Sequence, residues 1–455
     1  MRLIDSWKQL CETATELKAV IEPNGNTHSR SAINTRSKQL AVEWKQQALK
    51  PHHIIALHTT NSVEWISSFI AALYLDAVIV PIDFNISDEN ALTIAQKAGA
   101  THYSNGKETK QLNPQKPRRF QRKDIILGKL TSGSTGDPKL LFFSDSELRS
   151  DGERIIANMG ITADDINLGV IPWGHSYGIG NIVIPFLIQG TAFTWTTSPL
   201  PNDIATTIEK TKATVFPAVP ALLKALNRSN CSLALFQSLR LVISAGARLL
   251  PEIAQNFHDS YKLIPHNFYG SSETGGICYD QDGLDSLTGN SIGKIMTGVQ
   301  LEIARDGRFY VTSPSVFTYR NPVAKKDGQG RCLMVDRATI AADNSVNLGN
   351  RAKGFAKIGG KRIALNEIEE QLKSIDGIND AIVIELSSES DSTLGTAIES
   401  KLPLSEITKR LHDTLPRRLR PKSIKIYQEF PLTPRGKTNL AQIRSSLENQ
   451  SKETS

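Results

Sequence analysis

The sequence predicts an α/β protein: a large N-terminal domain of helix-covered parallel sheets with a small antiparallel β subdomain, then a small C-terminal α+β domain. Three observations predict it. Strand-like and helical segments alternate through roughly the first 270 residues. Residues 299–311 have the pattern of a hairpin, and the pattern of apolar and polar residues changes again after Asn366. A chain of 455 residues is also too long for one ordinary domain.

The alternating part begins with residues 31–46, whose apolar side chains recur at helical spacing. Further helices are expected at residues 63–75, 201–212 and 220–226. Short apolar runs predict strands at residues 53–57, 77–81, 170–172, 213–216 and 239–244. Ligands bind at the carboxyl ends of such parallel strands, which is where residues 244–247 and 269–270 fall.

The second half of the chain has a different pattern. Residues 299–303 alternate, Asp306-Gly307 forms a turn, and residues 308–311 return as an antiparallel partner. Later segments predict helices at residues 366–375 and 405–414 and strands at residues 381–385 and 423–427. We expect domains of residues 1–352 and 353–455, with a polar, frayed end after Glu448.

Composition limits the classes of partner. The chain is 39% hydrophobic and 22% charged, with a net charge of +7, as in globular water-soluble proteins. Basic residues cluster within residues 116–123 and 417–425, but no helix-turn-helix, zinc finger or RNA-binding aromatic motif accompanies them. We therefore expect no nucleic acid partner; a solvated face, or an anionic partner such as CoA or an acidic carrier protein, accounts better for the charge.

Cysteine usage and hydropathy point to the cytoplasm. The four cysteines are scattered, which argues against a disulfide framework and a structural zinc site. Residues 1–8 carry charges where a signal peptide needs an apolar run. The longest apolar stretch, residues 65–82, is interrupted by Asp76 and Pro81, so it predicts a buried helix and a strand and no membrane span.

The segment 130–139 concentrates small residues, hydroxyls and one cation. Glycines allow a sharp turn whose N–H groups can hold an anion, and the hydroxyls and the lysine add donors and charge. The polyphosphate-binding candidates are Thr131, Ser132, Gly133, Ser134, Thr135, Gly136 and Lys139. A plain surface loop is the alternative, but apolar runs at residues 125–127 and 140–143 favour a hairpin over a ligand. The Walker pattern of P-loop ATPases is absent.

Residues 131–139 resemble the phosphate loop of the adenylate-forming superfamily, which includes acyl- and aryl-CoA synthetases. Further resembling segments follow in the family's order at residues 269–273, Asp336 and Arg351, residues 357–369 and residues 431–437. The resemblance implies an ATP- and Mg²⁺-dependent ligase that adenylates a carboxylic acid and passes the acyl group to a thiol.

The resemblance also implies roles around ATP. Glu273 would bind the magnesium ion, although a glutamate at a helix N-terminus is the alternative. Ser272 stands at the position of a family threonine that contacts the α-phosphate, and Tyr269 would stack on adenine unless it is a core residue. The remaining candidates on the adenine side are Gly246, Ala247, Arg248, Gly270 and Ser271.

The ribose side departs from the family in detail. Asp336 would accept hydrogen bonds from the ribose hydroxyls, but Met334-Val335 replaces the usual Thr-Gly before it; a turn aspartate is the alternative. Arg351 would support the ribose or phosphate, although Asn350 separates it from Gly349.

The C-terminal domain would be mobile, as in the family. Lys437 would be the catalytic lysine, placing its ammonium between the carboxylate and the α-phosphate. Lys353 matches the hinge about which the small domain rotates between the half-reactions. The thiol-acceptor side would comprise Lys357, Gly359, Gly360 and Arg362.

The acid side is indicated by His175, which lies in a segment resembling the family's His-x-x-Gly motif; a structural histidine is equally compatible. Residues 170–175 contain no carboxylate to pair with an α-ammonium, so we expect a fatty or aryl acid without an α-amine. The thiol would come in trans, from CoA or a separate phosphopantetheinyl carrier protein. The alternatives are an o-succinylbenzoate-CoA-ligase-like enzyme and a catalytically silent nucleotide-binding homologue. The presence of Lys437, Glu273 and Lys139 disfavours the silent homologue.

Overall fold

The computed structural model describes residues 1–113, 120, 123–131, 139–320, 330–351, 355–358, 361–387, 392–433 and 438–453. The chain forms two compact units. The first comprises Met1–Ile303, Tyr310–Leu333 and Thr339–Asn347, and the second Ala304–Phe309, Met334–Ala338 and Leu348–Ser455. Residues 352–354 lie outside the described residues, so the domain boundary at 352/353 and the hinge at Lys353 stay predictions.

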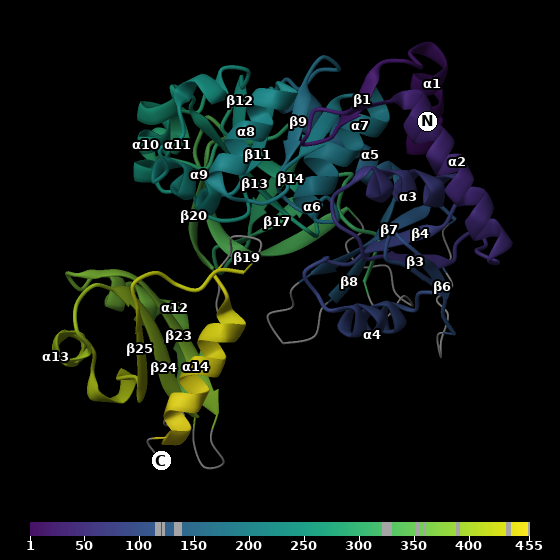
Figure 1. Cartoon of the computed structure of the whole chain (residues 1–455). Helices are drawn as coiled ribbons and strands as arrows, with labels where there is room; N and C mark the ends of the chain where they lie inside the picture. Colours follow the sequence, from purple (N-terminus) through teal and green to yellow (C-terminus); the bar gives the residue numbers. More distant parts are fainter. Residues whose placement is uncertain are drawn as a thin grey trace. The chain divides into compact units, whose positions relative to one another are not determined.

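A nine-stranded sheet runs through the first unit (Figure 1). In the order in which they lie, its strands are β15 (Lys294–Ile295), β14 (Gly275–Tyr279), β13 (Pro265–Ser271), β12 (Leu241–Ser244), β11 (Val215–Ala218), β9 (Ile166–Gly169), β10 (Ala192–Trp195), β1 (Lys18–Ile21) and β2 (Thr27–Ser29). The strands from β13 to β1 pair in parallel, as the alternating pattern predicted. The strand predicted at residues 170–172 is wrong, because β9 ends at Gly169 and these residues form the connection that follows it.

Helices cover this sheet through apolar side chains that alternate with exposed ones. They are α8 (Pro201–Thr211), α9 (Pro220–Asn227), the 3₁₀ turn η2 (Leu233–Phe236), α10 (Pro251–Tyr261) and α11 (Leu284–Thr288). Proline stands in the first turn of α8, α9 and α10, where its missing N–H costs no hydrogen bond. Their buried side chains, including Ile204, Leu223 and Phe257, pack in one core with Phe216 and Val242 of the sheet.

A seven-stranded sheet forms the other layer of the first unit. Its order is β18 (Tyr319–Arg320), β8 (Lys139–Ser144), β7 (Ile125–Thr131), β4 (Val78–Pro81), β3 (Ile54–Leu57), β5 (His102–Ser104) and β6 (Thr109–Gln111). Helix α2 (Arg30–Gln46) precedes β3, and α3 (Val63–Tyr74) and α4 (Asp88–Ala98) connect β3 to β4 and β4 to β5. Nine consecutive residues of α3 are buried, so the apolar stretch 65–82 is a buried helix followed by strand β4, as predicted. None of the helices described here is both long and apolar enough to cross a membrane.

The two sheets are connected by a helical layer. It contains α1 (Leu3–Thr13), α5 (Asp145–Met159), α6 (Ser176–Gly178), the π-helical turn η1 (Ile179–Val183) and α7 (Ile184–Gln189). Helix α5 begins with a capping box, in which Ser144 and Glu147 satisfy each other's backbone N–H groups. Strand β8 ends at Ser144, so the strand and the helix are continuous.

The predicted hairpin at residues 299–311 is confirmed. It consists of β16 (Gln300–Ile303) and β17 (Arg308–Thr312), which belong to a four-stranded sheet with β19 (Arg331–Ile340) and β20 (Val346–Arg351). The Asp306 side chain accepts a hydrogen bond from the Arg308 backbone N–H at 3.1 Å and so closes the turn.

The C-terminal part is α+β, as predicted, and contains further elements besides the predicted ones. Strands β21 (Phe355–Ile358) and β22 (Lys361–Ala364) form a ribbon, and β23 (Ile378–Ser387), β24 (Ser392–Ser400) and β25 (Ser423–Tyr427) form a sheet. The helical segments are α12 (Leu365–Lys373), α13 (Leu404–Thr414), η3 (Arg417–Leu419) and α14 (Leu440–Glu453). Helices α12 and α13 pack on one face of the sheet, and Ile443 and Leu447 of α14 pack on the other (Figure 1). Strand β24 and helix α14 were not predicted, and the chain described after Glu448 continues the helix instead of fraying.

Candidate active site

Two of the predicted ATP-binding segments follow neighbouring strands of the nine-stranded sheet. Strands β12 and β13 are parallel, and Ser244 at the end of β12 lies opposite Asn267 of β13. Gly246, Ala247 and Arg248 follow β12 as an exposed loop, while Tyr269 is half-buried near the end of β13. The carboxyl edge of the sheet thus brings together the small residues and the aromatic ring predicted to flank adenine.

The turn between β13 and β14 carries Glu273. The Ser271 hydroxyl accepts a hydrogen bond from the Glu273 N–H at 3.2 Å and lies 3.1 Å from the Thr274 hydroxyl. The Glu273 carbonyl accepts from the Phe317 N–H at 3.0 Å. These bonds fix the backbone of the turn, and Ser272 and Glu273 are half-buried within it. Glu273 therefore follows a strand and stands in a hairpin turn, which excludes the helix N-terminus considered as its alternative role.

The turn offers one carboxylate, that of Glu273, as a ligand for a magnesium ion. Within the described residues, no three histidine, cysteine or carboxylate side chains group as a complete metal site. Magnesium characteristically keeps several water ligands and takes only one or two protein carboxylates together with substrate phosphates. The half-buried carboxylate of Glu273 fits that donor set, whereas a metal held by protein ligands alone has no site among these residues.

The acid-side segment follows strand β9 and is held by Asn61. The Asn61 amide donates to the carbonyls of Gly169 and Ile171 at 3.3 and 3.0 Å, and its oxygen accepts from the Trp173 N–H at 3.0 Å. Gly174 then packs against Pro81, where an added Cβ would lie 2.5 Å from the proline Cβ. A larger residue would push this segment away from β4.

His175 lies beside a carboxylate and close to a half-buried tyrosine. Its Nε2 is 3.6 Å from Oδ2 of Asp83, a nearly buried residue that follows β4. Two residues later, Tyr177 donates its hydroxyl to the carbonyl of Ile243 at 3.2 Å, and its ring centre is 5.8 Å from that of Phe268. Burial raises the pKa of Tyr177 far above its usual value, so it remains a neutral donor. Tyr177 thereby ties the His175 segment to the strands of the adenine side.

The predicted hairpin around the phosphate loop is confirmed for its two arms. Strands β7 and β8 pair antiparallel, with Leu130 opposite Leu140 and Thr131 opposite Lys139. Ser132, Gly133, Ser134, Thr135 and Gly136 lie outside the described residues, as do the side chains of Thr131 and Lys139.

Lys129, also on β7, is a buried cation that the sequence analysis did not single out. Its side chain is buried, with Nζ 4.2 Å from the ring centre of Phe143. Burial lowers the pKa of Lys129, and the carboxylates of Asp151, Glu273 and Glu147 oppose that shift. The Lys129 amine therefore lies where it interacts electrostatically with the Glu273 carboxylate.

The other predicted site residues are placed only in part. Asp336 is buried on β19, and Arg351 is the last residue of β20. Lys357 and Arg362 lie opposite each other on the β21–β22 ribbon. Lys353, Gly359, Gly360 and Lys437 lie outside the described residues, so their roles stay predictions.

Comparison with known families decides the classification. The family model described as AMP-binding enzyme matches residues 7–112 and 100–313. The chain belongs to the AMP-binding enzyme family. The predicted membership of the adenylate-forming superfamily is thereby confirmed.

Two proteins whose names refer to CoA are similar to this chain. The probable CoA ligase CCL5 of Humulus lupulus is 27% identical over 342 residues, which cover 70% of this chain and 61% of that protein. The feruloyl-CoA synthase of an Amycolatopsis species is 21% identical over 483 residues, covering 97% of this chain and 98% of that one.

Solved structures of the AMP-binding family have the same fold. ATP-bound MatB from Rhodopseudomonas palustris superimposes with a TM-score of 0.77 at 18% identity, covering 99% of both chains. The o-succinylbenzoate CoA synthetase of Bacillus subtilis, in complex with an acyl-adenylate intermediate, gives a TM-score of 0.77 at 17% identity, covering 96% of this chain and 97% of the other. The predicted α/β fold class is confirmed over nearly the whole chain.

Sequence reasoning missed the side chains that hold the site segments from elsewhere in the chain. Asn61 lies outside the motifs of the sequence analysis, and its contact with residues more than 100 positions away has no local signal. Asp83 is also far from His175 in the sequence, so no pattern in residues 170–175 indicates that its carboxylate lies beside the histidine.

Proposed function

We propose that the protein is an ATP-dependent acid–thiol ligase, which converts a carboxylic acid to its acyl-adenylate with release of pyrophosphate and then transfers the acyl group to a thiol. The observation that carries the proposal is the carboxyl edge of the nine-stranded sheet. The loop after β12 and the Tyr269–Glu273 segment at the end of β13 lie on adjacent strands there, and the His175 segment follows β9, which β11 separates from β12. Membership of the AMP-binding family and the likeness to CoA-linked relatives support it.

The chemistry requires the site to bring two anions together. The carboxylate attacks the α-phosphorus, and the site must orient that attack and screen the negative charge on the phosphates. Glu273 would hold magnesium, which supplies positive charge to the phosphates when bound. Tyr269 and the Gly246–Arg248 loop would hold adenine, and Ser272 would donate to the α-phosphate.

Lys437 is proposed as the catalytic lysine and the 353–455 region as a domain that moves about Lys353. Asp336 and Arg351 are proposed for the ribose, and Lys357, Gly359, Gly360 and Arg362 for the side on which the thiol arrives. These assignments rest on the sequence motifs, since none of the comparisons locates site residues.

The acid is proposed to be fatty or aryl and to lack an α-amine. The segment 170–175 offers no carboxylate. Asp83 does lie near His175, but it is already within 3.6 Å of the His175 ring and accepts hydrogen bonds from the backbone N–H and side-chain amide of Asn85 at 3.0 Å. An α-ammonium beside Asp83 would compete with those partners.

CoA is proposed as the acyl acceptor, with a phosphopantetheinyl carrier protein as the alternative acceptor of the same chemistry. The named relatives CCL5 and feruloyl-CoA synthase favour CoA. The reducing cytoplasm is the proposed location, because the four cysteines are free in the structure.

The test is carboxylate-dependent exchange of labelled pyrophosphate into ATP, run over a panel of fatty, aryl, o-succinylbenzoic and α-amino acids. We expect exchange with at least one fatty or aryl acid, followed by thioester formation with CoA. Exchange with α-amino acids alone would overturn the substrate proposal. The absence of exchange with every acid, in a folded protein that binds ATP, would favour the silent homologue.

A further inference from the structure

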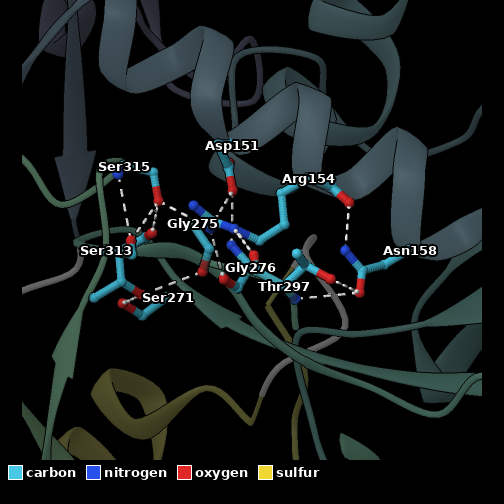
Figure 2. A network of polar contacts seen from close by, with 10 residues as sticks. Asp151, Arg154, Asn158, Ser271, Gly275, Gly276, Thr297, Ser313 and Ser315 are labelled. Atoms are coloured by element: carbon cyan, nitrogen blue, oxygen red, sulfur yellow. Dashed lines mark hydrogen bonds and ion pairs between the residues drawn. The ribbon is translucent and has the colours of Figure 1, made fainter. Parts of the chain in front are cut away.

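A buried polar network holds the turn that carries Glu273 against helix α5 (Figure 2). It starts from Asp151 and Arg154, which are one helical turn apart on α5 and are 5% and 6% exposed. Neither residue belongs to a motif of the sequence analysis. Both make contacts more than 100 residues away along the chain.

Asp151 fixes the start of β14. Its Oδ1 accepts a hydrogen bond from the Gly276 N–H at 2.8 Å. Gly275 has a φ of +72°, and a Cβ added there would lie 2.1 Å from Oδ1 of Asp151. The backbone of the turn therefore approaches the carboxylate as closely as only a glycine permits.

Arg154 also binds Gly276, through its carbonyl, whereas Asp151 binds its N–H. Its Nη1 donates to the Gly276 carbonyl and to the Ser315 hydroxyl, both at 3.0 Å, and its Nε donates to the Thr297 carbonyl at 3.2 Å. The Ser315 hydroxyl in turn donates to the Thr274 carbonyl at 2.6 Å. The fork of one guanidinium thus holds three segments of chain in fixed relation.

The two charges also depend on each other. Nη1 of Arg154 lies 3.6 Å from Oδ1 of Asp151, and both side chains are removed from water. Burial lowers the pKa of Arg154, and the charge of Asp151 opposes that shift. Loss of either partner leaves a buried charge without compensation, which is far more costly than loss of a surface pair.

We propose that Asp151 and Arg154 are positioning residues that hold the Ser271–Gly276 turn in the shape in which Glu273 binds the metal of MgATP. The inference deepens the proposed function and rests on it. Bonds from Asp151, Arg154 and Ser315 reach Thr274 and Gly276, which are one and three residues after Glu273. Partners of metal ligands that lie outside the coordination sphere typically change metal affinity or activity by roughly 10- to 100-fold when they are replaced.

The test compares Asp151→Asn and Arg154→Lys with a matched control, Asp165→Asn. Asp165 is also buried and also pairs with an arginine, since Arg240 Nε donates to its Oδ1 at 2.7 Å. Asp165 and Arg240 precede β9 and β12, at the amino ends of the strands, on the edge of the sheet opposite the Glu273 turn. The control therefore removes a similar pair without touching the turn.

Two measurements separate positioning from plain stability. The first is hydrogen exchange of the 269–279 segment without nucleotide; we expect faster exchange in Asp151→Asn and Arg154→Lys and no change in Asp165→Asn. The second is the Mg²⁺ concentration for half-maximal pyrophosphate exchange, which we expect to rise roughly 10-fold or more in the two variants only. The KM for the acid should stay near that of the wild type.

Ser315→Ala provides a milder variant in case the charged variants fail to fold. It removes one link of the network while the Asp151–Arg154 pair stays intact, so the same shifts should appear with smaller size. An active wild type whose folded variants keep its Mg²⁺ response would overturn the positioning role alone. A wild type that catalyses no exchange with any acid would overturn the proposed function, and the inference with it.

Discussion

The two turns at the edge of the nine-stranded sheet are held in opposite ways. The Glu273 turn, on the proposed metal side, is held by a buried ion pair, and the buried lysine Lys129 lies near the Glu273 carboxylate. The segment after β9, on the proposed acid side, is held by the neutral amide of Asn61. Hydrogen bonds to charged groups are stronger than those between neutral groups, so the metal-side turn is held by the stronger kind of bond.

The largest effect is expected from Lys437, the proposed catalytic lysine, because its ammonium would contact both the carboxylate of the acid and the α-phosphate of ATP. Lys437→Ala should lower adenylation by roughly 100- to 1000-fold, because it removes the cation placed where charge develops in the transition state. Thiol transfer from supplied acyl-adenylate should stay close to the wild-type rate. Equal loss of both half-reactions, measured by pyrophosphate exchange and by thioester formation, would contradict the two-state picture of the C-terminal domain.

A change confined to the metal side is expected from Glu273→Gln. The amide keeps the shape of the side chain, so the turn should fold, but it replaces an ionic ligand by a neutral one. Exchange activity should fall roughly 10- to 100-fold, and the Mg²⁺ requirement should rise, while the KM for the acid stays unchanged. A Mg²⁺ titration of the exchange reaction checks this; a normal Mg²⁺ response would remove Glu273 as the metal ligand.

A change confined to the acid side is expected from Asn61→Ala. Loss of three hydrogen bonds should loosen the segment that leads to His175, and the KM for the acid should rise about 10-fold. The Mg²⁺ response should be that of the wild type. Asn227→Ala is the matched control, because the Asn227 amide donates to the Ile253 carbonyl at 2.9 Å between α9 and α10. If the Mg²⁺ response shifted in Asn61→Ala, the separation of the two turns would be wrong.

Much of the fold could be predicted from the sequence, but the contacts between its segments could not. The arms of the phosphate-loop hairpin and the parallel strands followed from local apolar runs, and only the strand at residues 170–172 was misplaced. Strand β24 was missed because its sequence, Ser-Thr-Leu-Gly-Thr-Ala-Ile-Glu-Ser, mixes small and polar residues and takes its register from β23 and β25.

The candidate site divides in the same way. Glu273, Tyr269 and His175 stand in short motifs, and the structure puts them at the edge where strand–helix alternation predicted a ligand. Asp151 and Arg154 lie in the middle of an amphipathic helix, where charged residues ordinarily face water. Their burial depends on the packing of β14 against α5, which no local pattern encodes.

The smallest effect concerns pH and the buried charge of Lys129. Burial lowers the pKa of Lys129 from its usual 10.5, so between the folded and unfolded pKa values the unfolded chain binds more protons. The cost of burying the charge is therefore greatest below the folded-state pKa and declines as the pH rises towards the unfolded-state value of 10.5. The Tm of the wild type relative to Lys129→Met should rise by a few degrees towards pH 10, as thermal unfolding would show.

The control for the pH experiment is Lys107→Met, which removes an exposed lysine. Its Tm difference from the wild type should not follow the same pH trend. A Tm difference for Lys129→Met that stays constant from neutral pH to pH 10 would show that the ammonium is not desolvated in solution.

Because β8 continues directly into α5, the distance along the chain fixes where residues of α5 lie relative to the hairpin. The same uninterrupted run begins at Lys139, at the end of the phosphate-loop hairpin, and carries Asp151 and Arg154 further along. Each residue of a helix advances it by about 1.5 Å and turns it by about 100°. A single residue inserted between Glu147 and Asp151 would therefore rotate Asp151 and Arg154 away from β14. The number of residues between the phosphate-loop hairpin and this pair is thus set by the geometry of the site.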